Sequence, residues 1–175
     1  MPSSAPTFDE LMAGCTHSAV HLEMRDQYGV SDESDDFSTW LSTGQRDADP
    51  ASEYWAPWVD LISQTVARGV VVRRARIISE PVSPYIRYEH AGTDVNIHAG
   101  EQVRWLPRRQ ASTIALPGND FWLFDDQWVH WNHFTGDGAS ALHEPSDDPA
   151  AVKLCAEAFE AVWTRAIPHD QYEIR

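Results

Sequence analysis

The stretch from residue 58 to residue 79, WVDLISQTVARGVVVRRARIIS, decides the fold class. Its first half has mostly apolar residues at positions that share one face of an amphipathic helix, namely Trp58, Leu61, Ile62, Thr65 and Val66. Gly69 ends this helix, and the β-branched run after it predicts a central strand over residues 70–80. A helix joined by one glycine to a Val-rich strand is an αβ unit. We therefore expect an α/β fold with a mixed sheet flanked by helices.

Hydrophobic periodicity predicts more elements of both kinds along the chain. The further helices are expected over residues 7–11 (from a capping box), 35–44, 83–92 and 149–166. The further strands are expected over residues 18–28, 101–108 and 111–117, with a hairpin over 120–134 that turns at 125–127. Residues 31–36 and 135–148 are expected to be loops. Because no repeat or linker divides the chain, we expect one domain over residues 1–175.

The composition fits one compact domain with its own core, since 42% of the 175 residues are hydrophobic. No apolar run reaches 18 residues, and no basic patch precedes an apolar stretch at the N-terminus. We therefore expect neither a membrane-spanning helix nor a secretory signal. Cys15 and Cys155 are far apart in the sequence, which favours free thiols in a reducing cytoplasm.

The charge of the chain is strongly acidic but unevenly distributed. Its formal net charge of −14 disfavours direct binding to nucleic acid or to an anionic membrane, because phosphates are repelled. Residues 68–109 nevertheless carry eight arginines and four acidic residues, a local charge of +4, which leaves −18 for the rest. This segment holds either an anionic ligand or the carboxylates of the protein itself, and the sequence leaves both alternatives open.

The candidate site lies at the end of the strand predicted over residues 70–80. Side chains alternate along a strand, so Arg74, Arg76 and Glu80 share one face near its carboxyl end. Ligands bind at that end of strands in open α/β sheets, and the planar guanidinium group binds two oxygen atoms at once. The candidate ligand-binding residues are Arg74, Arg76, Glu80, Arg87, Glu89, Glu101, Arg104, Trp105, Arg108, Asp120, Trp122, Asp125 and His133. They form either a ligand site or a lattice of internal salt bridges.

The histidines do not show the spacing of a metal site, and we predict no metal and no cofactor. His130 and His133 fall on opposite faces of the predicted strand, while His90 and His98 lie in loop-like sequence. A zinc site needs three or four convergent ligands. His133 alone remains a candidate general base. The motifs GxSxG, GxGxxG, HExxH and the P-loop are absent, and the single lysine falls in the last predicted helix.

Several long segments resemble a family of uncharacterised actinobacterial proteins, classed as a domain of unknown function. They are HLEMRDQY, RRARIISEPVSPYIRYEH, NIHAGEQVRWLPRR, PGNDFWLFDDQWVHWNHFTGDG and FEAVWTRAIPHDQY. Members of this family are often encoded beside helix-turn-helix regulators tied to development and antibiotic production. The family pattern falls on Glu23, Arg25, Asp26, Tyr28, Arg76, Glu80, Pro81, Ser83, Tyr85, Arg87, Glu89, Gly100, Glu101, Arg104, Trp105, Arg108, Asp120, Trp122, Asp125 and His133. The resemblance implies no mechanism.

A second resemblance is to half of a phospholipase D-like domain. It rests on the helix that ends in ARG before the strand VVVRRARII, and on the hairpin DFWLFDDQWVHW. Enzymes of that superfamily carry the motif His-x-Lys with a downstream aspartate, and this sequence has no His-x-Lys. The resemblance therefore implies a phospholipase D-like fold that has lost the phosphodiesterase chemistry.

Two functions are consistent with these features. The first is a non-enzymatic regulatory or interaction protein whose acidic surface docks on a basic helix-turn-helix regulator. The alternative is an enzyme or small-molecule binder whose cleft holds a phosphate or carboxylate group. In that case Arg76, Arg87 and Arg104 bind the anion, and the candidate acids and bases are Glu80, Glu101 and His133.

Overall fold

The computed structural model of the protein describes residues 5–29 and 34–175. In this part of the chain, the α-helices are α1 Phe8–Gly14, α2 Ser34–Thr43, α3 Ala56–Ala67, α4 Pro84–Ala99 and α5 Pro149–Arg165. The strands are β1 Ser18–Glu23, β2 Val71–Ile78, β3 Gln102–Pro107, β4 Asp120–Phe124, β5 Trp128–Phe134, β6 Ser140–Ser146 and β7 Ile167–Pro168. Short 3-10 turns follow β3 and β7.

All these strands form one mixed sheet, in the order β6-β5-β4-β1-β2-β3-β7. The central strands β1, β2 and β3 are parallel, whereas β4, β5 and β6 run antiparallel on one side and β7 on the other. The predicted α/β class with a mixed sheet is thus confirmed. The expected αβ unit forms as well, with α3 followed directly by the central strand β2.

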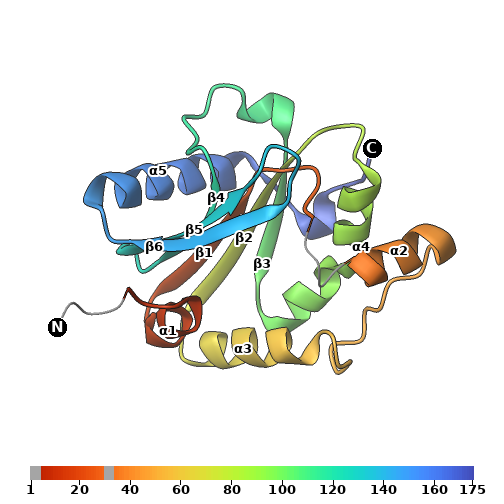
Figure 1. Ribbon diagram of the computed structural model, residues 1–175, viewed down its shortest axis with the longest axis horizontal. Helices are drawn as coiled ribbons and strands as arrows, with labels where there is room; N and C mark the ends of the chain where they lie inside the picture. Colours follow the sequence, from red (N-terminus) through yellow and green to blue (C-terminus); the bar gives the residue numbers. More distant parts are fainter. Residues whose placement is uncertain (1–4, 30–33) are drawn as a thin grey trace.

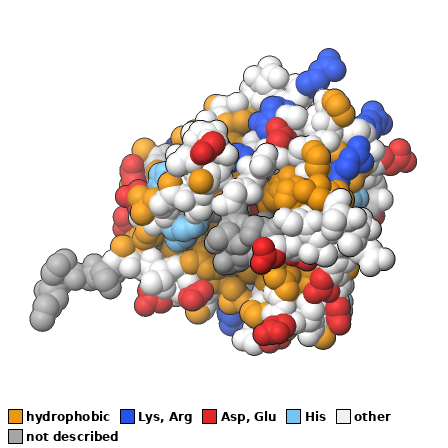
Figure 2. All heavy atoms as spheres, turned by 45° about the vertical axis from the view of Figure 1, so that its right-hand side comes forward, with side chains coloured by type: hydrophobic (Ala, Val, Ile, Leu, Met, Phe, Trp, Pro, Cys, Tyr) orange, Lys and Arg blue, Asp and Glu red, His pale blue; other side chains and the backbone are white. Residues whose placement is uncertain are grey.

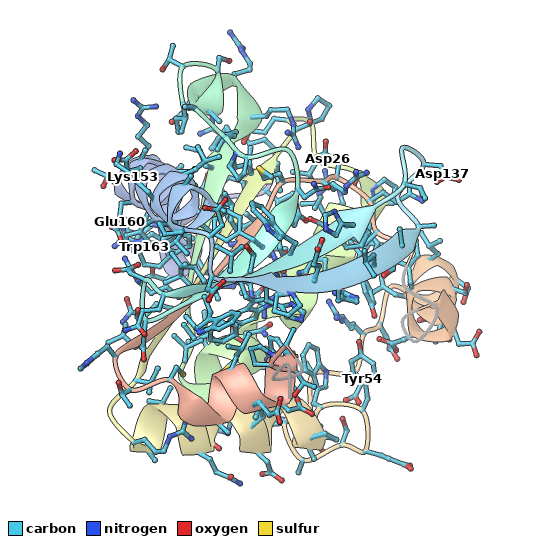
Figure 3. The ribbon with its side chains drawn as sticks, turned by 60° about the vertical axis from the view of Figure 1, so that its left-hand side comes forward. Asp26, Tyr54, Asp137, Lys153, Glu160 and Trp163 are labelled. Carbon is cyan, nitrogen blue, oxygen red and sulfur yellow. The ribbon has the colours of Figure 1, made fainter. Side chains whose placement is uncertain are left out.

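Helix α5 covers one face of the sheet, and α1, α3 and α4 cover the other (Figure 1). The face under α5 is apolar. Phe159 and Val162 of α5 pack there against Leu22, Ile77 and other alternate residues of the central strands. Figure 3 shows Tyr54, which precedes α3, on the opposite side of the sheet from Trp163 of α5.

The other face of the sheet has two separate apolar clusters. One cluster packs α1 and α3 on residues such as Val72 and Trp122, and the second packs α4 on Ile78 and Trp105. The residues between Val72 and Ile78 on this face of β2 are Arg74 and Arg76, as the alternation of side chains predicts. A polar row therefore separates the two clusters.

Several elements differ from the sequence-based predictions. The strand expected over residues 18–28 ends at Glu23. Helix α4 continues through Gly92 to Ala99, so His90 and His98 lie on a helix and not in a loop. Residues 111–117 form turns where a strand was expected. Residues 140–146, expected to be a loop, form the edge strand β6 because their backbone pairs with β5. Of the predicted loop at residues 31–36, positions 31–33 lie outside the described residues.

The turn between β4 and β5 forms where it was predicted. Asp125 and Asp126 both have positive φ angles there, which aspartate tolerates better than most residues. None of the helices in the described ranges is both long and apolar enough to pass through a lipid bilayer.

Candidate ligand-binding site

A cavity of about 420 Å³ lies over the polar row, on the face of the sheet that carries α3 and α4. Half of its lining consists of aromatic rings, namely His21, Tyr28, Tyr54, Trp55, Trp58, Tyr85, Trp122 and Phe134. The other half is polar and consists of Glu23, Arg46, Arg74, Arg76, Glu89, Asn96, Asp120 and Asn132. The site thus combines flat apolar surfaces with groups that donate and accept hydrogen bonds.

Strand register brings the central charges of the site together. His21 pairs with Arg74 across the parallel strands β1 and β2, and Glu23 pairs with Arg76. The antiparallel neighbour β4 places Trp122 beside His21. Because these residues occupy alternate positions, all of them point to the same face.

The two buried arginines are held by glutamates on three different elements. Arg74 donates to Glu101 through Nε at 2.8 Å and to Glu23 through Nη1 at 2.5 Å. Arg76 donates to Glu23 at 2.6 Å, to Glu89 at 2.6 Å and to the hydroxyl of Thr93 at 3.3 Å. Every guanidinium nitrogen of both residues is therefore engaged, since Nη2 of Arg74 also reaches Glu101 at 3.4 Å.

This network keeps its charges despite burial. Burial alone raises the pKa of Glu23, but Arg76 and Arg74 outweigh that effect and bring it to about 2. Burial likewise opposes the charge of Arg74, whose pKa is nevertheless raised by Glu101 and Glu23. A buried carboxylate paired with arginines stays ionised, so the network is close to neutral as a whole.

Glu101 directly follows α4 and fixes the wall of the site behind Arg74. Its side chain accepts hydrogen bonds from the indole of Trp58 at 2.7 Å and from the amide of Asn96 at 2.9 Å. Gly100, in the left-handed conformation with φ of 109°, ends α4 and lets the chain turn toward the sheet at that point. One carboxylate therefore connects α3, α4 and β2.

Arg46 closes the site from the connection between α2 and α3. Its guanidinium lies 3.6 Å from the ring centroid of Tyr88 and donates to the backbone carbonyl of that residue at 2.5 Å. Its Nη1 also lies 3.6 Å from Glu89. Gly92 makes this approach possible, because a Cβ at that position would collide with the guanidinium of Arg46. The glycine inside α4 thus serves packing and does not end the helix.

Asp120, at the start of β4, is 2% exposed. One oxygen accepts from the backbone N–H of Met24 at 3.0 Å, and the other accepts from the phenol of Tyr28. Burial raises the pKa of Asp120 to about 7, the hydrogen bond from Tyr28 lowers it, and the negative charge of Glu23 raises it. Asp120 therefore changes its charge near neutral pH.

His21 is a buried and uncharged residue of the cavity lining. Its ring stacks on Trp122 at a centroid distance of 4.3 Å, and its Nε2 lies 3.4 Å from the amide of Asn132. Burial lowers the pKa of His21 to about 3, against the opposing effect of Glu23. This imidazole is neutral at any physiological pH and belongs to the aromatic wall.

Six of the predicted site residues meet here: Arg74, Arg76, Glu89, Asp120 and Trp122 line the cavity, and Glu101 holds Arg74. Four residues of the internal lattice, Glu23, Arg74, Arg76 and Glu89, thus also line the cavity. The other seven lie elsewhere, namely Glu80, Arg87, Arg104, Trp105, Arg108, Asp125 and His133.

The contacts of most of these seven residues show structural roles. Arg104 points to the face under α5 and lies 4.3 Å from the ring centroid of Trp163. Trp105 is buried under the C-terminal turn, where its indole donates to His169 at 3.0 Å. Asp125 accepts hydrogen bonds from three successive backbone N–H groups, those of Thr16, His17 and Ser18 at the start of β1.

The remaining members are at or near the surface. Arg108 donates to the carbonyls of Met24 and Ile77, and so ties the ends of β1 and β2 together. Glu80 is exposed and accepts from Tyr172, and Arg87 is exposed on α4. His133 lies 3.4 Å from Glu144 of the edge strand, which removes it from the candidate acids and bases of the cavity.

Sequence reasoning missed several lining residues. His21 and Glu23 carried a usable signal, because both alternate with buried Val20 and Leu22 along β1. Arg46, Tyr54 and Trp55 come from a connection without periodicity, and no local pattern brings them to the sheet. No group of three histidines, cysteines or acidic residues suited to a metal ion occurs among the described residues.

Comparisons with known proteins place the chain in a family and support the fold. The family model described as "Domain of unknown function (DUF6879)" matches residues 6–174. A search of curated protein sequences found no match. Among solved structures, the phospholipase D family member Nuc from Salmonella typhimurium is similar with a TM-score of 0.52 and 10% identity, over 91% of this chain and 86% of that one. At this identity the likeness concerns the fold alone.

Proposed function

We propose that this chain, which belongs to the DUF6879 family of domains of unknown function, is a non-enzymatic regulatory protein that binds a small molecule in its cavity. The observation that carries this proposal is the cavity of about 420 Å³ with aromatic walls around convergent polar groups. Its volume falls within the range of small-molecule sites, roughly 300–1,000 Å³. Aromatic walls with a few fixed polar groups are also typical of such sites.

The rigidity of the lining supports binding of a ligand. The network that joins Arg74 and Arg76 to the three glutamates connects β1, β2, α4 and the residue after α4. Buried ion pairs of this kind add little net stability, because desolvation offsets the attraction. These ion pairs hold the polar groups of the cavity in one geometry, and this lowers the entropic cost of binding a ligand.

The chemistry of the lining favours binding over covalent catalysis. The cavity lining in the described part of the chain contains no serine, threonine, cysteine or lysine. Of the other side chains that can act as nucleophiles, His21 is stacked on Trp122 and Glu23 is paired with two arginines. The motif His-x-Lys is also absent from the sequence. Both observations support a phospholipase D-like fold that binds a molecule without cleaving a phosphodiester.

A second candidate function, docking on a basic partner such as a helix-turn-helix regulator, is favoured by the distribution of charge. Arg74 and Arg76 are buried against glutamates, so they do not offset the acidic charge of the surface. In Figure 2 the acidic side chains are spread over the visible face, whereas the basic ones gather mainly toward one end. Complementary charge steers association with a basic protein. Ligand binding and docking are compatible as input and output of one regulator.

A fragment screen by differential scanning fluorimetry tests the binding function. We expect some small aromatic compounds to raise the melting temperature, because a ligand that binds only the folded state stabilises it. Tyr54→Ala, which opens the cavity wall, should reduce that shift. The matched control is Leu154→Ala on α5, since Tyr54 and Leu154 are equally exposed (38% and 39%) and Leu154 does not line the cavity.

Two results would count against this function. One is a screen in which no compound stabilises the wild type. The other is a set of hits that Tyr54→Ala and Leu154→Ala weaken equally. The docking candidate is tested separately by size-exclusion chromatography with a purified helix-turn-helix regulator from the same organism, where the absence of a complex at low salt contradicts it.

A further inference from the structure

The acidic groups of the cavity differ in whether a cation neutralises them. Glu23 is held by both buried arginines, and Glu89 is held by Arg76 with Arg46 at 3.6 Å. Asp120 has no such partner. Its bonds come from a neutral phenol and a backbone N–H group, and no lysine, arginine or histidine nitrogen of the described residues lies within 4.0 Å of its carboxylate oxygens. Among the carboxyl groups of the lining, Asp120 is therefore the one available to pair with a cationic ligand.

The cationic groups of the cavity are already paired with carboxylates of the protein itself. Arg74 and Arg76 use all their guanidinium nitrogens within the protein. Each guanidinium keeps two further N–H donors, but a phosphate or carboxylate ligand that accepted from them would lie beside glutamates that already neutralise these arginines. Such a ligand would bring repulsion between like charges into a buried site. The pairing of the arginines thus disfavours the anionic ligand that the sequence left open as an alternative.

We infer that the cavity takes a small organic cation, an amine carried on an aromatic or similarly flat body, with its ammonium group against Asp120. This inference rests on the proposed function and names the ligand class of that site. The flat body fits between the rings of the lining, such as Tyr85, Trp122 and Phe134. Aromatic faces also attract a desolvated ammonium group. An ammonium group donates to the free lone pairs of the carboxylate, while Tyr28 and Met24 keep their bonds to it.

Binding of an amine should depend on pH through Asp120. The groups that act on this carboxyl are the phenol of Tyr28, the carboxylate of Glu23 and the guanidinium of Arg25. Because the pKa of Asp120 is about 7, its ionised fraction rises about tenfold between pH 6 and pH 8. An alkylamine remains protonated over this range, so its affinity should rise by about the same factor. A neutral compound of the same shape should not respond.

Three probes with one phenol ring and different end groups test the inference by isothermal titration calorimetry: tyramine, tyrosol and 4-hydroxyphenylacetate. We expect tyramine to bind more tightly than tyrosol, and 4-hydroxyphenylacetate to bind weakest. The preference for tyramine should be about tenfold larger at pH 8 than at pH 6. Asp120→Asn should abolish this preference while it leaves the affinity for tyrosol within about twofold. The control Asp126→Asn removes the same charge at an exposed turn residue with positive φ and should change nothing.

A second variant covers the case in which Asp120→Asn does not fold. Tyr28→Phe removes the phenolic hydroxyl but keeps the ring, and it leaves Asp120 able to bind the amine. Its preference for tyramine should persist, but the rise of this preference with pH should move to higher pH, because the hydrogen bond from Tyr28 lowers the pKa of Asp120. If tyrosol binds as tightly as tyramine at pH 8, or if 4-hydroxyphenylacetate binds best, the inference is wrong while the cavity still binds ligands. If none of the three probes binds, the inference is wrong as well, and the fragment screen then decides separately whether the cavity binds any small molecule.

Discussion

The face of the sheet under α5 and the face under α3 and α4 are made from alternate residues of the same strands, but they are packed in opposite ways. On β2, Ala75 and Ile77 face α5 and join a continuous apolar core. Arg74 and Arg76, their direct neighbours, face the other side and line a cavity. A single strand thus carries one face that packs the core and one face that lines the cavity. The difference teaches that the buried ion pairs of β2 belong to one face, since Arg73 on the other face pairs with a largely exposed glutamate.

The largest expected effect comes from breaking the buried network. Arg76→Met keeps much of the side-chain volume but leaves Glu23 and Glu89 buried without this partner. We expect the free energy of unfolding to fall by about 3–5 kcal/mol. Arg73→Met is the matched control on the opposite face of the same strand, where Arg73 pairs with a largely exposed glutamate. Its loss should be below about 1 kcal/mol. Urea denaturation measures both, and equal losses would contradict the contrast between the faces.

The pH dependence of stability should also belong to the cavity face. The folded pKa of Asp120 is about 7 and its unfolded value is about 3.9, so the folded state binds more protons between these pH values. The contribution of Asp120 to stability is therefore present below about pH 4 and is lost as the pH rises to 7. Asp120→Asn should remove this loss and become more stable relative to the wild type by at least about 1 kcal/mol between pH 5 and pH 8.

Denaturation curves of the wild type and Asp120→Asn at both pH values measure that change. Comparing the two proteins at each pH cancels the contribution of His21, whose lowered pKa acts in the opposite direction below pH 6.5. Asp126→Asn serves again as the control and should show a constant difference from the wild type. A constant difference for Asp120→Asn as well would show that Asp120 ionises normally in the folded protein.

The smallest expected effect compares the N-terminal caps of the helices on the two faces. Ser83 caps α4 by accepting from the N–H of Ile86, and Asp148 caps α5 by accepting from that of Ala150. Replacing either residue by alanine should cost about 1 kcal/mol. Only Ser83→Ala should also weaken ligand binding, since α4 carries Glu89 and Asn96 of the cavity. Calorimetric titration with the best probe separates the two variants, and equal effects on binding would remove the functional distinction between the faces.

The sequence predicted the elements whose pattern is local. The helix before Gly69, the strand after it and the hairpin at Asp125 all have signals within a few residues. Strand β6 was missed because it lies at the edge of the sheet, where Leu142 and its neighbours are exposed and show no alternation of burial. Its formation depends on pairing with β5. The turns at residues 111–117 were mistaken for a strand because Ile114 and Leu116 are apolar, although both pack against the core from irregular backbone.

Residues at the centre of the candidate site were predicted from the sequence, whereas residues at its rim were not. Strand alternation indicated Arg74 and Arg76. The family pattern indicated Arg76, Glu89, Glu101, Asp120 and Trp122. Arg46 and Tyr54 lie on a long connection, and their place against the sheet depends on tertiary contacts that no short-range pattern encodes. The choice between lattice and site could not be made from the sequence, because the same arginines form the internal salt bridges and line the cavity.

The contact between Gly92 and Arg46 makes two distant positions of the chain constrain each other during evolution. A methyl group at position 92 and an arginine at position 46 exclude each other in this geometry. A lineage that acquires alanine in the middle of α4 must move the guanidinium of Arg46 away from Tyr88 or shorten the side chain at position 46. Either change reshapes one wall of the cavity, so a mutation that looks like a simple gain in helix propensity would alter the shape of the proposed binding site.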